Sequence, residues 1–457
     1  MLTDRVVSLA RQFWSPVFAQ ARTLDRAVQC GLSAAVALGR RTITNAILAR
    51  GKPDQDWSAD YKLFSRSEWS SEELFDATLV SFLKRYPEGV VPIALDDTRL
   101  RKTGRKIPRA FWQRDPLSPP FRVNLMWGLR FLQASVLFPH HREGDLPARG
   151  VPVAFQEAPA LRKPSARASA EEHEQYRSEA RLYNLSTQAL AVIGQLRSRA
   201  DHLGAGDRTI VIAADGSFCN RTIFRAQLER VHIIARARKD ARLCYPAPAG
   251  SRRSYEQITF TPEQVRLDES VPFASATFMV GSGRHEVRFK DIHHVLWRRG
   301  GGRTPLRLIV LAGQPYRLKS GLGASRREHA YLLTTDLMSS VEHLIQVYLD
   351  RWQIEINHRD EKDVLGVGQA QVWSEKSVPR QPAFMVALYA LLLLAALAEF
   401  GPGRTSDFAP LAKWRRAAMR PSLLDLLTLL RRELSDKQAT APIWEISQRN
   451  LLLAAHT

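Results

Sequence analysis

Two short apolar runs, each followed by acidic residues, constrain the fold of this chain most strongly. The first run, residues 89–95 (GVVPIAL), precedes Asp96 and Asp97, and the second, residues 209–214 (TIVIAA), precedes Asp215. Apolar runs of this length, rich in β-branched residues, are typical of strands that are buried on both faces of a sheet. We therefore predict an α/β protein in which two buried strands carry carboxylates at their C-terminal ends.

A helix predicted from residue 341 to about residue 364 offers a third acid. Tyr348, Arg351, Glu355 and Lys362 follow one another at offsets that fall on one narrow face, at about 100° per residue. On such a face Glu355 could ligate a metal ion, while Arg351 and Lys362 hold phosphate oxygens and Tyr348 positions them. The simpler alternative is a solvated helix face with an ion pair between Arg351 and Glu355.

The charge of the chain favours a polyanionic partner. Among 457 residues there are 66 Lys and Arg against 46 Asp and Glu, so the formal net charge is +20. Neutralising phosphates with basic side chains releases counterions, and nucleic acid is the partner that such an excess predicts.

Basic residues cluster after each acidic position, and such clusters are either solvated loops or phosphate contacts. The first cluster consists of Arg99, Arg101, Lys102, Arg105, Lys106 and Arg109, and the second of Arg221, Arg225, Arg230, Arg236, Arg238, Lys239 and Arg242. Beside strand ends that carry acids, we expect a share of both clusters to contact DNA.

Neither a membrane nor an oxidising compartment is expected. The first residues carry an acid and two arginines and do not read as a signal peptide. The longest uncharged apolar run, Ala383 to Ala398, is shorter than a bilayer core and predicts a buried helix. Three cysteines match no zinc site and no disulfide framework, which favours a reduced, intracellular compartment.

The spacing of the four residues on this helix is similar to the signature of a known protein family. The spacing Tyr-x2-Arg-x3-Glu-x6-Lys at Tyr348, Arg351, Glu355 and Lys362 resembles the YREK signature of bacterial insertion-sequence transposases of the DDE class. Residues 95–102 (LDDTRLRK) resemble the region of the first acid in that group, and residues 212–217 (IAADGS) resemble that of the second.

The resemblance implies a fold and a division of the chain. It implies an RNase H-like α/β catalytic core that is interrupted by a β-rich insertion and flanked by helical N- and C-terminal regions. The predicted divisions are a helical N-terminal domain that binds DNA ends (1–88), the first part of the core (89–230), the insertion (231–325), the second part of the core with the YREK helix (326–400), and a helical C-terminal region (401–457). Within the first part of the core, residues 139–163 are rich in Pro, Arg and Gly and are predicted to be an irregular excursion.

The resemblance also implies a catalytic site. Asp97, Asp215 and Glu355 would be both the catalytic residues and the ligands of two Mg²⁺ or Mn²⁺ ions, and their carboxylates are expected to meet near one point. Successive residues of a strand point to opposite faces, so only one of Asp96 and Asp97 can face the metals. An Asp-Thr pair closes the first strand in the family, which favours Asp97, and Asp96 is the alternative. Tyr348, Arg351 and Lys362 would bind DNA.

The implied activity is metal-dependent cleavage at transposon ends followed by strand transfer into target DNA. The partners would be double-stranded DNA at the transposon ends and at the target, and a second copy of the chain in a homodimeric synaptic complex. The location would be cytoplasmic and associated with the nucleoid. Two alternatives stay open, namely an inactive or domesticated relative that only binds DNA, and a metal-dependent nuclease that cuts without joining strands.

Overall fold

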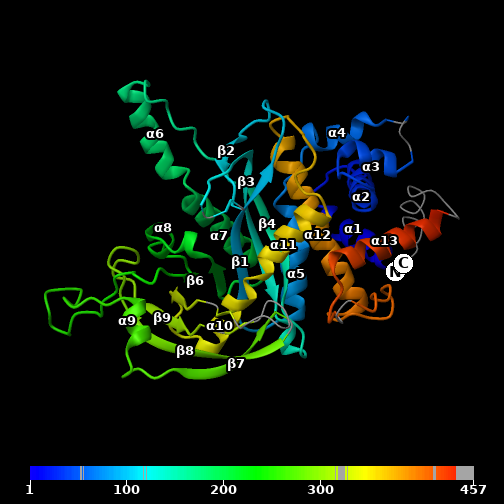
Figure 1. Cartoon of the computed structure of the whole chain (residues 1–457). Coiled ribbons are helices and arrows are strands. Elements are labelled where there is room, and N and C mark those ends of the chain that lie inside the picture. Colours follow the sequence, from blue (N-terminus) through cyan, green and yellow to red (C-terminus); the bar gives the residue numbers. More distant parts are fainter. Residues whose placement is uncertain are drawn as a thin grey trace.

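The computed structural model describes residues 1–51, 54, 56–116, 118–119, 121–281, 283–313, 315–316, 325–326, 328–414 and 418–438 (Figure 1). Within these residues the N-terminal helices are α1 (Leu2–Trp14), α2 (Ala21–Val36), α3 (Ile43–Ala49), α4 (Ser58–Ser65), η1 (Glu73–Phe75) and α5 (Asp76–Arg85). The next elements are β1 (Val91–Arg101), β2 (Phe111–Arg114), β3 (Leu125–Phe138), η2 (His140–Arg142), β4 (Arg149–Glu157), α6 (Ala170–Leu182), α7 (Leu185–His202), β5 (Ile210–Ala214), η3 (Gly216–Phe218), α8 (Arg221–Phe224) and β6 (Val231–Arg236).

The second half of the chain adds further strands and then helices. These elements are α9 (Pro262–Leu267), β7 (Ala274–Val280), β8 (Gly283–Val295), β9 (Leu306–Leu311), β10 (Pro315–Tyr316), β11 (Ser325–Arg326), β12 (Ala330–Thr334), α10 (Val341–Asp350), α11 (Gln353–Arg359), the π-helical turn η4 (Asp360–Val364), α12 (Ser377–Phe400) and α13 (Leu423–Gln438). Residues 439–457 of the predicted C-terminal region lie outside the described residues.

Within the described residues, one ten-stranded mixed sheet organises the molecule. Its strand order is β2-β3-β1-β5-β6-β12-β9-β8-β7, and β4 pairs with β3. Strand β1 is antiparallel to β3 and parallel to β5, and β5 is parallel to β6. The predicted insertion (231–325) contains strands β6 to β9, and these continue the same sheet rather than forming a separate one.

The two faces of this sheet have different partners. On β1, Ile93 and Leu95 point into a large core shared with the N-terminal helices and α12. Ala94 points to the opposite face, where it shares a second core with Leu344 of α10 and Ile354 of α11. Because side chains alternate along a strand, the face on which an acid of β1 lies decides which helices it meets.

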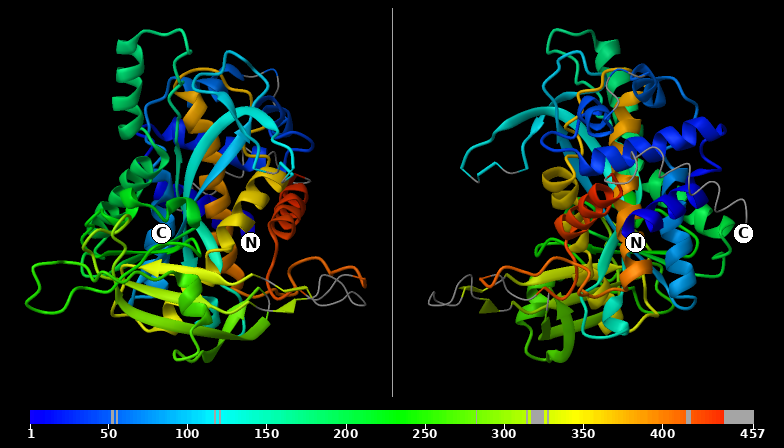
Figure 2. Two further views of the ribbon diagram at one scale, coloured as in Figure 1. Left: turned by 60° about the vertical axis from the view of Figure 1, so that its left-hand side comes forward. Right: turned by 90° about the vertical axis from the view of Figure 1, so that its right-hand side faces the viewer.

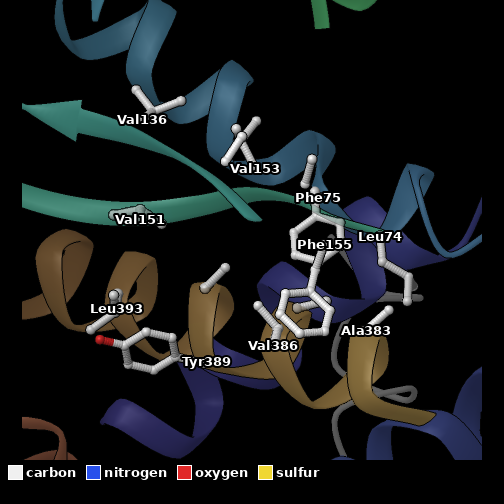
Figure 3. Packing of buried hydrophobic residues seen from close by; sticks show 14 of the residues in the cluster. Leu74, Phe75, Val136, Val151, Val153, Phe155, Ala383, Val386, Tyr389 and Leu393 are labelled. Carbon is white, nitrogen blue, oxygen red and sulfur yellow. The ribbon is translucent and has the colours of Figure 1, made fainter. Parts of the chain in front are cut away.

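Helix α12 is the centre of the large core. Its residues Ala383, Val386, Tyr389 and Leu393 pack against β4, as Figure 3 shows. The helix is long and apolar enough to cross a membrane, but 78% of its most apolar window is buried inside the protein. A helix that is apolar all round is explained by burial on every side, as the sequence predicts for residues 383–398.

Two local predictions differ from the structure. Strand β1 does not end at Asp96 but continues to Arg101, because β3 pairs with it along that length while β5 pairs only as far as Leu95. The predicted excursion at residues 139–163 contains β4, whose residues pair with β3. The acids therefore lie where β1 loses its parallel neighbour, and not at the end of the strand.

The N-terminal helices are packed into the core through aromatic rings. Phe384 of α12 is fully buried, and its ring centroid lies 5.3 Å from that of Trp14 and 5.4 Å from that of Phe64. We expect Phe384→Ala to lower the free energy of unfolding by about 3–5 kcal/mol, the usual cost of removing a buried phenyl ring. Denaturant titration measures this change, with Phe121→Ala as the control because the side chain of Phe121 is 90% exposed. Equal effects of the two substitutions would contradict this packing.

Candidate active site

Strands β1 and β5 bring two acids together. Leu95 pairs with Ala214 at the end of the parallel ladder, so Asp96 and Asp215 are the next residues on neighbouring strands. Asp215 then begins the short turn η3, where its Oδ1 accepts hydrogen bonds from the backbone N–H of Ser217 at 2.8 Å and from its hydroxyl at 2.5 Å. The local turn thus holds the Asp215 carboxylate at the end of β5.

The electrostatics of Asp96 reflect this neighbour. Burial raises the pKa of Asp96 to about 7, and the Asp215 carboxylate adds to the rise, whereas Arg351 opposes it. Two carboxylates brought together with little solvent between them favour a proton or a cation, since both cannot easily stay charged without one.

Asp97 lies on the other face of β1. It shares that face with Leu95, and its Oδ2 lies 3.6 Å from Nη2 of Arg99. Burial raises the pKa of Asp97, with Arg99 and Arg130 opposing the rise. The sequence favours Asp97 over Asp96, but in the structure it is Asp96 that shares the sheet face with α10 and α11.

Arg351 joins the strand to the helix. Its Nη2 donates a hydrogen bond to Oε1 of Glu355 at 3.1 Å, and its Nη1 lies 3.9 Å from Oδ2 of Asp96. The guanidinium carbon lies 5.8 Å from the centroid of the Tyr348 ring. Although burial opposes the charge of Arg351, its pKa is raised by Tyr348, Asp96 and Glu355.

Three residues of the predicted helix face therefore do meet, but the helix is not continuous. Helix α10 ends at Asp350, and after a tight turn at Arg351 and Trp352 α11 begins at Gln353. In this turn the N–H groups of Ile354 and Glu355 bond to carbonyls three residues earlier, at 3.0 and 3.1 Å. The hydrogen bond between Arg351 and Glu355 shows that these two residues still lie on the same side across the turn.

Lys362 lies in the π-helical turn that follows α11. Two acids of this wider turn, Asp360 and Glu361, are buried in the protein. Glu361 accepts a hydrogen bond from Gln133 of β3 at 2.7 Å. Lys362 itself is half-buried, and its positive charge acts on the nearby His358, whose pKa it helps to lower. Lys362 follows Glu355 by seven residues and lies in the next helical element along the chain.

His358 is a residue of this site that the sequence analysis does not single out. It is buried, its Nε2 has no hydrogen-bond partner in the described residues, and burial together with Lys362 and Arg351 lowers its pKa to about 3. It follows Glu355 by three residues and precedes Lys362 by four, so its spacing already places it on the same helical face.

The donor chemistry fits a divalent cation, although the expected cage is not formed. Within the described residues, no group of three His, Cys, Asp or Glu side chains is close enough to hold a metal ion. Asp96, Asp215 and Glu355 are nevertheless hard oxygen donors of the kind that Mg²⁺ and Mn²⁺ prefer. Arg351 supplies the positive charge between Asp96 and Glu355.

The same guanidinium has unused donors. Its Nε and Nη1 are buried and make no hydrogen bond within the part of the chain that the structure describes. Buried N–H donors without partners are costly, and a phosphate oxygen is a ligand that would satisfy them. The site thus combines adjacent acids with an unsatisfied cationic donor.

The family of the chain follows from comparison with known proteins. Residues 16–301 match the family model described as DDE superfamily endonuclease. This match covers more than half of the chain, and the chain belongs to this family. The matched residues include Asp96, Asp97 and Asp215 and end before Glu355.

The other comparisons add little. No curated protein matches the sequence. Among solved structures, the chain is similar to the piggyBac transposase in its synaptic complex with hairpin DNA, at 12% identity and a TM-score of 0.32. That match covers 79% of this chain and 57% of the transposase chain, and a TM-score of this size is too low to establish a shared fold.

The raised pKa of Asp96 has a consequence for stability. Its carboxyl stays protonated up to about pH 7 in the folded state but only to about its ordinary value of 3.8 when unfolded. Between these values the folded state binds more protons, so its stability falls as the pH rises. We expect Asp96→Asn in metal-free buffer to raise the melting temperature more at pH 8 than at pH 4. At pH 8 we expect the free energy of unfolding to rise by up to a few kcal/mol, because each unit of pKa shift corresponds to about 1.4 kcal/mol.

Asp336→Asn is a control of opposite sign. Burial raises the pKa of Asp336, but hydrogen bonds from Ser339 and Met338 outweigh this and lower it. That substitution should destabilise the protein at pH 8 more than at very low pH. A change for Asp96→Asn that is the same at both pH values would rule out a strongly raised pKa of Asp96.

Proposed function

We propose that this chain is a DDE transposase that cleaves DNA at transposon ends and joins the freed 3′ ends to target DNA. The observation that carries the proposal is the convergence of Asp96, Asp215 and, through Arg351, Glu355 on one face of the sheet. Membership of the DDE endonuclease family supports the cleavage step. The YREK spacing of Tyr348, Arg351, Glu355 and Lys362 supports the assignment to the insertion-sequence group.

An RNase H-like core is part of this proposal. Three antiparallel strands, β4, β3 and β1, are followed across the sheet by β5 and β6, which run parallel to β1. In this arrangement β1 is central and carries the first acid, and β5 carries the second. Strands β7, β8 and β9 would belong to the β-rich insertion and β12 to the second part of the core, and helices α1–α5 would bind the DNA ends.

We assign the role of first acid to Asp96 in place of Asp97. Asp96 shares its face of the sheet with the helices that carry Arg351 and Glu355, and after burial the charge of Asp215 is the main cause of its raised pKa. Asp97 has its own counter-ions in Arg99 and Arg130. Asp96, Asp215 and Glu355 would then hold one or two Mg²⁺ or Mn²⁺ ions.

Bound cations would activate the attacking oxygen and stabilise the leaving oxygen of the phosphodiester. The residues of the chain position the substrate for this chemistry. Arg351 would direct its Nε and Nη1 donors, which have no hydrogen-bond partner in the described residues, to a phosphate oxygen. Glu355 would then be free of its hydrogen bond with Arg351 and could bind a metal ion. Lys362 would hold a neighbouring phosphate, and the Tyr348 ring, stacked near Arg351, would keep the guanidinium in place.

The proposed partners and setting follow from the same assignment. Double-stranded DNA, both at the transposon ends and at the target, would bind the basic surface, and two copies of the chain would assemble on a pair of ends. The location would be cytoplasmic, at the nucleoid. A nuclease that cuts without joining strands accords equally with the endonuclease family and is the second candidate.

Two of the three acids, Asp96 and Glu355, are tested by cleavage of a plasmid that carries the gene with its flanking DNA. We expect Glu355→Gln and Asp96→Asn to reduce Mg²⁺-dependent cleavage at least about a hundredfold, because loss of a metal ligand removes several kcal/mol of transition-state stabilisation. DNA binding should persist in both variants. Asp97→Asn is the matched control and should retain most of the activity.

Three results would count against this assignment. Loss of cleavage in Asp97→Asn but not in Asp96→Asn would restore Asp97 as the first acid. Full activity of Glu355→Gln would remove the helix from the catalytic site. Cleavage without any joined product in the wild-type reaction would favour the second candidate.

The role of Lys362 is tested by salt dependence. Lys362→Ala should weaken DNA binding and reduce the slope of log K against log salt by about one, because one phosphate contact is lost. Arg359→Ala is a suitable control, since Arg359 is exposed on the same segment and pairs with Asp360. An unchanged slope for Lys362→Ala would exclude a direct phosphate contact. Fluorescence anisotropy at several salt concentrations measures both variants.

A further inference from the structure

The hairpin formed by β2 and β3 carries an aromatic cluster that the catalytic site does not use. Trp112 and Trp127 are cross-strand partners whose ring centroids lie 5.8 Å apart at an interplanar angle of 69°. The Arg105 guanidinium carbon lies 4.6 Å from the Trp112 centroid and 5.1 Å from that of Trp127. Trp112 is nevertheless 53% exposed, so that part of its surface is open to a ligand.

The charge around this cluster is one-sided. From residue 98 to residue 130 the only acid is Asp115, which pairs with Arg101 at 3.0 Å. The basic residues of the same stretch are Arg99, Arg101, Lys102, Arg105, Lys106, Arg109, Arg114, Arg122 and Arg130. Phe121, Val123 and Leu125, near the tip, are exposed apolar residues. The hairpin projects from the body of the molecule (Figure 2).

The base of the hairpin is fixed to the segment that follows the YREK helix. The Lys102 ammonium is buried and donates to the carbonyls of Gly368 and Ala370 at 2.9 and 2.8 Å. Arg109 bridges Glu157 of β4 and Glu375. A glycine is required at residue 128, because a Cβ there would lie 2.4 Å from the Leu100 carbonyl oxygen. The hairpin is therefore a rigid extension of the catalytic sheet.

The cluster lies on the same face of the sheet as Asp96. Asp96 pairs with Gln133, and every second residue back along β3 points to the same face, down to Trp127. Six residues of strand span about 20 Å at roughly 3.3 Å per residue.

We propose that the Arg105–Trp112–Trp127 cluster binds an unpaired stretch of the DNA strand, about 20 Å along the sheet from the phosphate held at Asp96 and Glu355. This inference rests on the proposed function, because it takes that phosphate as its reference point. A base stacks on the open surface of Trp112 while the arginines of the hairpin contact its phosphates. Aromatic rings accept a base face only where the base is not already stacked in a duplex.

Two other occupants fit this surface less well. A second copy of a chain with a net charge of +20 would bring like-charged surfaces together at this hairpin. An intact duplex would meet the arginines but would leave the Trp112 surface without a partner. An unpaired strand uses both the charge and the exposed ring.

The test compares binding of an oligo(dT) strand and of a blunt duplex of equal length by the full-length protein. We expect Trp112→Ala to weaken binding of oligo(dT) by between about fivefold and 150-fold, the range for losing one stacked base, with little change for the duplex. The salt slope should not change, because no charge is removed. Trp112→Tyr should restore most of the affinity, and Trp414→Ala is the matched control, because Trp414 is 85% exposed and lies far along the chain from the hairpin.

The possible outcomes separate this inference from the proposed function. Equal losses for Trp112→Ala and Trp414→Ala, or equal losses on the two DNAs, overturn the stacking role while plasmid cleavage continues. A change of oligomeric state in Trp112→Ala on sedimentation also overturns it, since the cluster would then be a contact between copies. Failure of the wild-type protein to bind either DNA removes the proposed function together with the inference.

Discussion

The ion pairs of Arg351 with Asp96 and Glu355 are the interactions on which the site depends. They join strand β1 to the segment of α10 and α11 that packs on it. Without a cation, Asp96 and Asp215 would face each other uncompensated, and the guanidinium relieves part of this repulsion. Arg351 thus holds the site together while leaving two of its own donors for a further anionic ligand.

The sheet makes this arrangement possible. Strand β1 is paired on both sides only up to Leu95, and beyond that point β3 alone accompanies it. The acids lie at this step, where the parallel neighbour of β1 ends. The same continuation of β1 leads to the basic hairpin, so the candidate catalytic site and the aromatic cluster share one rigid element and one face.

Much of the candidate site could be predicted from the sequence. The apolar runs before Asp96 and Asp215 indicate buried strands, and the spacing of Tyr348, Arg351 and Glu355 indicates one helical face, because both patterns are local. The strand β4 was not predicted, since its Pro and Gly residues favour irregular structure and only pairing with β3 makes it a strand. The break after Asp350 was also missed, because helical spacing hardly changes across a tight turn.

The sequence by itself determined the residue types of this protein: strand-borne acids, a helix with Arg351 and Glu355, a strong positive charge and a helix apolar on all sides. Only the tertiary structure decided that Asp96, and not Asp97, faces the helix. Successive residues of a strand point to opposite faces of the sheet. Which helices cover each face depends on packing between segments that are far apart in the chain. It likewise decided that Trp112 and Trp127 meet, since cross-strand register depends on how β2 and β3 pair.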